Sequence, residues 1–149
     1  MWTVHSEPTD SLVSVALLRA YFKELIDRYN GRPMPEELVD AEMEIDPSTG
    51  FAAFLVARYD GTPAGCVGLR VSGDLTRMYV APMYRRRGGG RVLLNAIEEQ
   101  ARELGFERIR IDTRDDLIEA RTLYVACGYA EVAPFNAAPY AEHWYEKHL

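Results

Sequence analysis

Apolar residues at helical spacing predict two helices in the first part of the chain. Within residues 10–29 they recur three or four positions apart, as at Leu12, Val15, Leu18, Phe22 and Leu25. Asp10 or Ser11 can cap the start of this helix, and Asn30-Gly31 can end it. Pro35 stands at the start of a second, shorter helix, where a proline does least harm.

The pattern then changes to short apolar segments separated by turn residues. We predict strands over residues 53–59, 64–71 and 75–80, with Asp60-Gly61 and Ser72-Gly73 in the turns. The connections are too short for a crossover, so these strands should form an antiparallel meander.

Helical spacing returns from Val92 to Leu104, and Gly105 stands where a helix C-terminus favours glycine. On the polar side of this helix we expect Glu98 to pair with Arg102, four residues later.

The last part of the chain alternates strands with one more helix. Residues 108–112, 129–132 and 143–147 have the pattern of strands. Asp116 to Glu119 has the form of a capping box, which would open a helix that ends at Gly128. The fold class that we predict is mixed α/β, with a central, mostly antiparallel sheet and flanking helices.

Length and composition narrow the class of protein. The chain has 149 residues, which suits a single domain over residues 1–149, and 48% of them are hydrophobic. A net charge of -6 argues against a nucleic-acid partner. The chain has no apolar run that could span a membrane and no signal-like N-terminus, so we expect a cytoplasmic protein without a membrane partner. Cys66 and Cys127 form no C-x-x-C pair and suggest buried thiols, and we expect no metal site.

One stretch departs from this acidic composition. From Leu75 to Ile97 the chain has no Asp or Glu but has five arginines, and Gly88-Gly89-Gly90 stand just before the predicted helix. Consecutive glycines are costly at a helix start unless a ligand must approach the backbone closely. Free N–H groups at a helix N-terminus favour a phosphate, and arginines add charge-assisted hydrogen bonds. We therefore expect a phosphate-binding turn over Arg85 to Arg91.

Several kinds of turn could follow a strand in this way. A Walker A loop would need a Lys-Ser or Lys-Thr after the glycines, and none is present. Gly88 and Gly90 fit part of a dinucleotide fingerprint, with Asp112 as the ribose-binding acid, but an antiparallel meander precedes the turn rather than a βαβ unit. A flexible surface turn with solvated arginines is the remaining alternative.

Two motifs at their usual separation resemble the GNAT superfamily of N-acetyltransferases, over about residues 50 to 132. Arg85-x-x-Gly88-x-Gly90 matches the Q/R-x-x-G-x-G/A signature that grips the pyrophosphate of coenzyme A. Ala120-x-x-Leu123-Tyr124-x-x-x-Gly128-Tyr129 resembles the second motif of the family. The resemblance implies a fourth strand that splays from the fifth, with acetyl-CoA as co-substrate between them.

The resemblance also implies roles for individual residues. Tyr124 would donate a proton to the leaving thiolate, and Asp74 is the candidate base that deprotonates the amine. Leu117 replaces an asparagine that many relatives place there in contact with the cofactor. The residues implied in cofactor binding are Met78, Tyr79, Val80, Arg85, Arg86, Arg87, Gly88, Gly89, Gly90 and Arg91.

The acceptor side is less specified. The resemblance implies direct attack by a primary amine of a small molecule, amino acid or peptide, in a pocket that Asn136 and Tyr140 could line. A catalytically silent acyl-CoA-binding module of the same fold is the alternative. The last strand, residues 143–147, could pair between the subunits of a homodimer.

Overall fold

The first four strands form an antiparallel sheet in chain order. The computed structural model describes all 149 residues. Strands β1 (Trp2–Ser6), β2 (Phe51–Tyr59), β3 (Thr62–Arg70) and β4 (Leu75–Val80) are neighbours in that order. The predicted meander is confirmed, and β4 has the predicted bounds. Strand β1, which pairs with β2 over its whole length, was not predicted.

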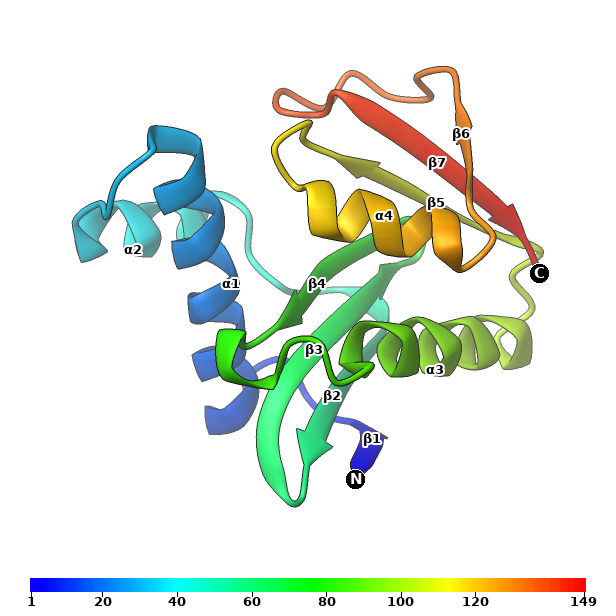
Figure 1. Ribbon diagram of the computed structural model, residues 1–149, viewed down its shortest axis with the longest axis horizontal. Coiled ribbons are helices and arrows are strands. Elements are labelled where there is room, and N and C mark those ends of the chain that lie inside the picture. The colour runs from blue at the N-terminus through cyan, green and yellow to red at the C-terminus, as the bar shows by residue number, and fades with distance from the viewer.

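A second antiparallel sheet contains β5 (Arg108–Thr113), β6 (Ala130–Val132) and β7 (His143–His148). Its order is β5-β7-β6, so both edges of β7 are already paired within the chain. An isolated parallel bridge between Asp74 and Arg110 joins the two sheets. Beyond this bridge β4 and β5 diverge, as the family resemblance implies (Figure 1).

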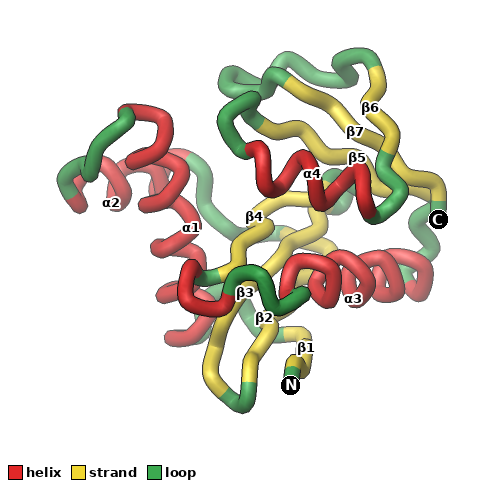
Figure 2. The backbone as a smooth tube through the Cα atoms, in the orientation of Figure 1, coloured by secondary structure: helices red, strands yellow, loops and turns green.

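Helices cover both faces of the first sheet (Figures 1 and 2). Helix α1 (Leu12–Asn30) packs on β3 and β4, and α2 (Glu36–Ile45) packs on α1. Helix α3 (Gly89–Glu103) lies on the opposite face, and α4 (Ile118–Ala126) lies beside the second sheet. Alternation along the strands separates the two cores, since Leu55 packs with the α3 side and Val56 with the α1 side. None of these helices is long and apolar enough to cross a membrane.

The helix ends agree with the sequence at α1 and differ at α4. The Ser11 side chain caps α1 by accepting from the Ser14 N–H at 3.1 Å, and Gly31 ends it with a φ of 69°. The expected capping box is wrong, because Leu117 is the N-cap of α4 and makes no side-chain cap. Glu119 instead receives Arg28 of α1 at 2.7 Å.

The expected pair between Glu98 and Arg102 is also wrong. Glu98 is buried, with 3% of its surface exposed. Its carboxylate accepts from the Tyr129 hydroxyl and the Lys147 ammonium, both at 2.9 Å. Arg102 pairs with the exposed Glu99 instead. Glu98 therefore links α3 to the second sheet and is not an exposed surface charge.

His143 joins β7 to two other segments. Its ring nitrogens contact Glu131 of β6 at 2.7 Å and Asp115 of the β5–α4 loop at 2.8 Å. The hydrogen bond with Glu131, followed by the one with Asp115, raises the pKa of His143. A histidine with a raised folded pKa stabilises the fold fully below its unfolded pKa, and this contribution is lost as the pH rises through the folded pKa.

We therefore expect wild type to gain stability over the His143→Gln variant as the pH falls from 8.5 to 5.5. Because both carboxylates are largely exposed to solvent, the gain should be at most about 1 kcal/mol. Urea unfolding of both proteins at several pH values measures it. A difference that grows with rising pH would contradict this assignment.

Candidate functional site

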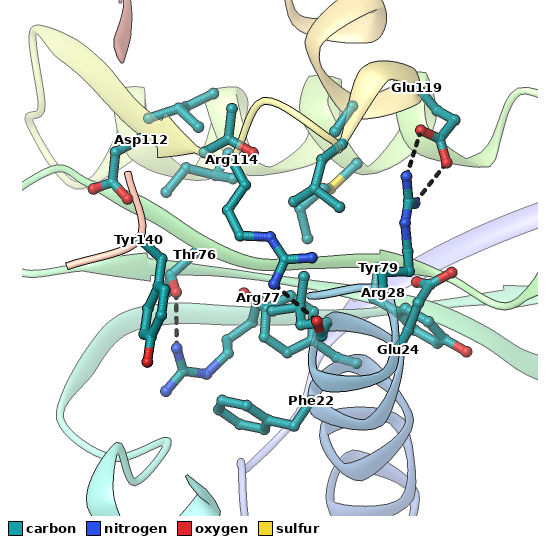
Figure 3. A pocket seen from close by; sticks show the side chains of 18 of the residues that line it. Phe22, Glu24, Arg28, Thr76, Arg77, Tyr79, Asp112, Arg114, Glu119 and Tyr140 are labelled. Carbon is teal, nitrogen blue, oxygen red and sulfur yellow. Dashed lines mark hydrogen bonds and ion pairs between the residues drawn. The ribbon is translucent and has the colours of Figure 1, made fainter. Parts of the chain in front are cut away.

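A cavity of about 1220 Å³ opens where β4 and β5 diverge. One wall is β4 with the C-terminal half of α1, and the other is β5 with α4. The glycine turn borders one end, and the loop that carries Asn136 and Tyr140 borders the other. Figure 3 shows Asp112, Thr76 and Tyr140 toward one side of this cavity, with Glu24, Arg28 and Glu119 toward the other.

A bulge in β4 changes the direction of the side chains where the strand borders the cavity. Arg77 and Met78 together oppose the single residue Val67, and Arg77 has a φ of 56°. The Arg77 side chain is only 2% exposed. It is held by Asp46 at 3.2 Å, and its guanidinium lies 4.8 Å from the centre of the Phe22 ring. The bulge thereby turns Tyr79 into the core under α1.

The free edge of β4 presents backbone groups to the cavity. The Ala81 N–H donates to the Ala64 carbonyl of β3 at 2.8 Å. Because polar groups alternate along a strand, those of Val80, and of Met78 before it, point away from β3. The Val80 carbonyl accepts from Nε of Arg85 at 2.8 Å, which agrees with this direction.

The glycine turn presents a row of free donors. The backbone N–H groups of residues 86–91 donate to no acceptor in the chain, and they include the first N–H groups of α3. Gly88 caps the helix with a φ of 80°. The indole N–H of Trp2 donates to the Arg87 carbonyl at 2.8 Å and anchors the turn to β1.

Packing within the chain explains two of the three glycines. A Cβ at Gly89 would lie 2.5 Å from the Trp2 ring, and one at Gly90 would lie 2.6 Å from Leu123. The sequence argument assigned all three glycines to the approach of a ligand. The structure adds a cause within the chain, since Gly89 and Gly90 pack closely against neighbouring side chains and Gly88 has a left-handed backbone.

The arginines of the turn do not act together. The Arg85 guanidinium is held by Glu24 of α1 at 2.7 and 2.9 Å. Arg87 lies over the Tyr59 ring, 5.0 Å from its centre, and does not line the cavity. Arg86 and Arg91 line the cavity and make no ion pair. Of the four arginines in the turn, these two have unpaired side chains at the cavity.

Tyr124 lines the cavity from α4 and is only 4% exposed. Its ring packs against Tyr129 and Tyr145, and its hydroxyl hydrogen-bonds to no group of the chain. Burial, with smaller contributions from Tyr21, Asp112 and Tyr145, raises the pKa of Tyr124. The phenol therefore keeps its proton at neutral pH and can act as a donor.

Two carboxylates line the cavity at the fork between β4 and β5. Asp74 stands at the bridge itself, and Asp112 lies two residues beyond it on β5. Asp112 accepts from the Asn136 amide at 2.9 Å. The Trp144 indole N–H donates to the other end of that amide at 2.9 Å, which fixes its orientation. Asn136 and Tyr140 lie at the cavity as expected, while Leu117 lines it with an apolar side chain.

Contacts from the last turns of α1 cross the cavity from wall to wall. Arg28 reaches Glu119 at 2.7 Å, and Arg114 of the β5–α4 loop donates to the Leu25 carbonyl at 2.8 Å. Tyr29 packs edge-on against Tyr140, with ring centres 5.2 Å apart. These contacts join the two walls of the cavity.

Sequence reasoning missed several residues that shape this site. Trp2 and Glu24 lie on elements distant in sequence from the turn, and no local pattern links them to it. Arg77 could have been noticed, because it is the charged position within the alternating strand Leu75–Val80. Asp112 was considered only as a ribose-binding acid.

Comparison with known proteins gives a consistent result. The model of the acetyltransferase (GNAT) family matches residues 15–129. An IAA acetyltransferase of Azospirillum brasilense is 34% identical over 76% of this chain and 77% of its own length. An uncharacterised N-acetyltransferase of Schizosaccharomyces pombe is 29% identical over 83% of this chain and 78% of its own.

Solved structures share the fold. A GNAT-family acetyltransferase of Staphylococcus aureus superposes with a TM-score of 0.75 at 16% identity and covers 99% of both chains. The PaiA N-acetyltransferase of Thermoplasma acidophilum, solved in complex with coenzyme A, has a TM-score of 0.75 at 17% identity. It covers 100% of this chain and 99% of its own.

Proposed function

The chain belongs to the GNAT family of acetyltransferases and is an acetyl-CoA-dependent N-acetyltransferase. We propose that it acetylates a primary amine by direct attack within the cavity between β4 and β5. The donor would enter from the glycine turn, and the acceptor from the end that carries Asn136 and Tyr140. No covalent enzyme intermediate is part of the proposal.

The observation that carries this proposal is the row of free N–H groups over residues 86–91, at one end of the cavity that Tyr124 lines. Free donors at a helix N-terminus suit the pyrophosphate of acetyl-CoA. From there the pantetheine arm would follow the open edge of β4, where the backbone of Met78, Tyr79 and Val80 runs. Arg86 and Arg91 would add charge at the rim, while Arg85 would position Val80 through its bond to the carbonyl.

The residues of this chain would then share the proton transfers. A carboxylate at the fork, for which Asp74 is the candidate from the sequence, takes a proton from the acceptor ammonium. The neutral amine attacks the thioester carbonyl, and a backbone N–H of β4 stabilises the oxyanion. The C–S bond breaks as the intermediate loses its second amine proton to water, and Tyr124 gives its proton to the thiolate and recovers one from solvent.

Acetyl-CoA should bind the purified protein with a micromolar dissociation constant, measured by calorimetry. S-acetylpantetheine, which carries the same thioester without the pyrophosphate and nucleotide, should bind at least about 100-fold more weakly. Release of free thiol in the presence of a panel of primary amines then reports transfer. Equal affinity for both thioesters would refute the role of the turn, and tight acetyl-CoA binding without transfer to any amine would favour the silent module.

A further inference from the structure

We propose that the acceptor is a diamine, whose reacting nitrogen is held by Asp112 and whose second ammonium group is held by Asp74. In this arrangement Asp112 takes the proton from the reacting nitrogen, in place of Asp74, the candidate base from the sequence. This inference rests on the proposed function and names the class of amine that the acceptor end recognises. It follows from which charged side chains in the cavity are already paired and which are not.

The cations along the acceptor part of the cavity are all engaged. Arg28 pairs with Glu119, Arg77 with Asp46, and Arg114 with Asp116 at 2.8 Å. Arg70 lies 3.7 Å from Asp46. An anionic acceptor would have to displace one of these carboxylates, so the cavity offers it no ready partner.

The acids of the same region are in the opposite situation. Asp74 and Asp112 line the cavity and pair with no cation of the chain. Glu42 of α2 also lines the cavity and forms no ion pair. The cavity is therefore divided by charge. Its free cations, Arg86 and Arg91, stand at the glycine turn, and its free anions stand at the fork and on α2.

The fork places the two aspartates at a spacing that a short diamine can bridge. Asp74 is level with Arg110, and Asp112 lies two residues further along β5 on the same side of the strand. Two residues advance by about 6.6 Å and neighbouring strands lie about 4.8 Å apart, so the two Cα atoms are about 8 Å apart. A four-carbon diamine can reach both carboxylates across this gap.

The division of roles follows from the positions of the two aspartates in the fork. Asp74 stands at the bridge, whereas Asp112 lies two residues further along β5, where the strands have diverged. Because the bridge is parallel, Asp112 is also nearer the level of residues 78–80 of β4, along which the thioester would lie. Asp112 is therefore the acid nearer the reacting carbonyl. The amide of Asn136, oriented by Trp144, holds the Asp112 carboxylate in place.

Two tyrosines with largely buried rings present free hydroxyls to this cavity. Tyr124 is 4% exposed and Tyr79 is 8% exposed, and both line the cavity. Neither hydroxyl has a hydrogen-bond partner in the chain. Both hydroxyls are reached from the cavity rather than enclosed by protein, so they are available to hydrogen-bond to the substrates.

The test compares putrescine, a four-carbon diamine, with n-butylamine, which has the same chain and one amine. We expect kcat/KM of the wild-type protein to be about 30-fold higher for putrescine, the effect of one charge-assisted hydrogen bond. Asp74→Asn should lower the putrescine value by about 30-fold more than the n-butylamine value, whereas Asp74→Glu should retain most of the discrimination. Asp112→Asn should lower both values by about 100-fold.

The controls separate this inference from the proposed function. Glu103→Gln removes an exposed negative charge at the end of α3, away from the cavity, and should leave the ratio of the two amines unchanged. Acetyl-CoA affinity and urea unfolding of each variant show whether its fold is intact. The wild-type comparison requires no variant at all. Equal turnover of the two amines, or transfer only to amines of another class, would overturn the diamine assignment. Neither result would contradict the proposed acetyl transfer. Acetyl-CoA binding without transfer to any amine would overturn the proposed function.

Discussion

Replacing Tyr124 with phenylalanine should lower kcat by about 100-fold and leave the affinity for acetyl-CoA within about twofold. The phenol is buried with its hydroxyl free of partners in the chain, and burial raises its pKa, so the proton is present when the thiolate departs. Without it the thiolate must leave unprotonated into a cavity partly lined by apolar side chains, where a charge is poorly solvated.

The same variant should be almost neutral for stability. The Tyr124 hydroxyl makes no hydrogen bond that the phenylalanine would lose, so the free energy of unfolding should change by less than about 0.5 kcal/mol. Tyr129→Phe is the matched control, because its hydroxyl does bond to Glu98. The control should lose stability by about 1 kcal/mol and keep its kcat. Steady-state kinetics with urea unfolding separates the two, and a Tyr124→Phe protein with wild-type kcat would contradict the role in proton donation.

The fold could be predicted largely because most of its elements carry strong periodic patterns. The alternation of Leu75–Val80 and the helical spacing of α3 needed no knowledge of their neighbours. Strand β1 was not predicted, because its five residues include the polar His5 and Ser6 and its formation depends on pairing with the distant β2. The order β5-β7-β6 is likewise set by contacts that no local pattern records.

The site divides in the same way between local and distant causes. The glycine turn could be recognised because its free donors come from local backbone conformation. The directions of Arg85 and Arg87 could not, because Glu24 and Tyr59 on other elements fix them. The place of Asp112 depends on the divergence of two strands, which only the folded chain determines.

Glu98 shows how a periodic pattern can be present and still be misread. It lies four residues after Leu94 and three before Ala101, which places it on the apolar stripe of α3, although its charge favours a surface position. The deciding partners, Tyr129 and Lys147, come from the far end of the chain. A charge on the buried stripe is itself the sign that such a partner must exist.

Glu98→Ala should therefore lower the free energy of unfolding by about 3 kcal/mol, because it leaves the Lys147 ammonium without its carboxylate and the Tyr129 hydroxyl without its acceptor. Glu98→Gln retains an acceptor for Tyr129 but not the charge for Lys147, so its loss should be intermediate. Glu99→Ala, one residue further along and largely exposed, should change stability by less than about 0.5 kcal/mol. Urea unfolding of the three variants measures the series. Equal losses of unfolding free energy for Glu98→Ala and Glu99→Ala would mean that the buried carboxylate does not stabilise the fold. The expected order would show that the Glu98 side chain holds α3 against the second sheet, and hence supports the wall that carries Tyr124.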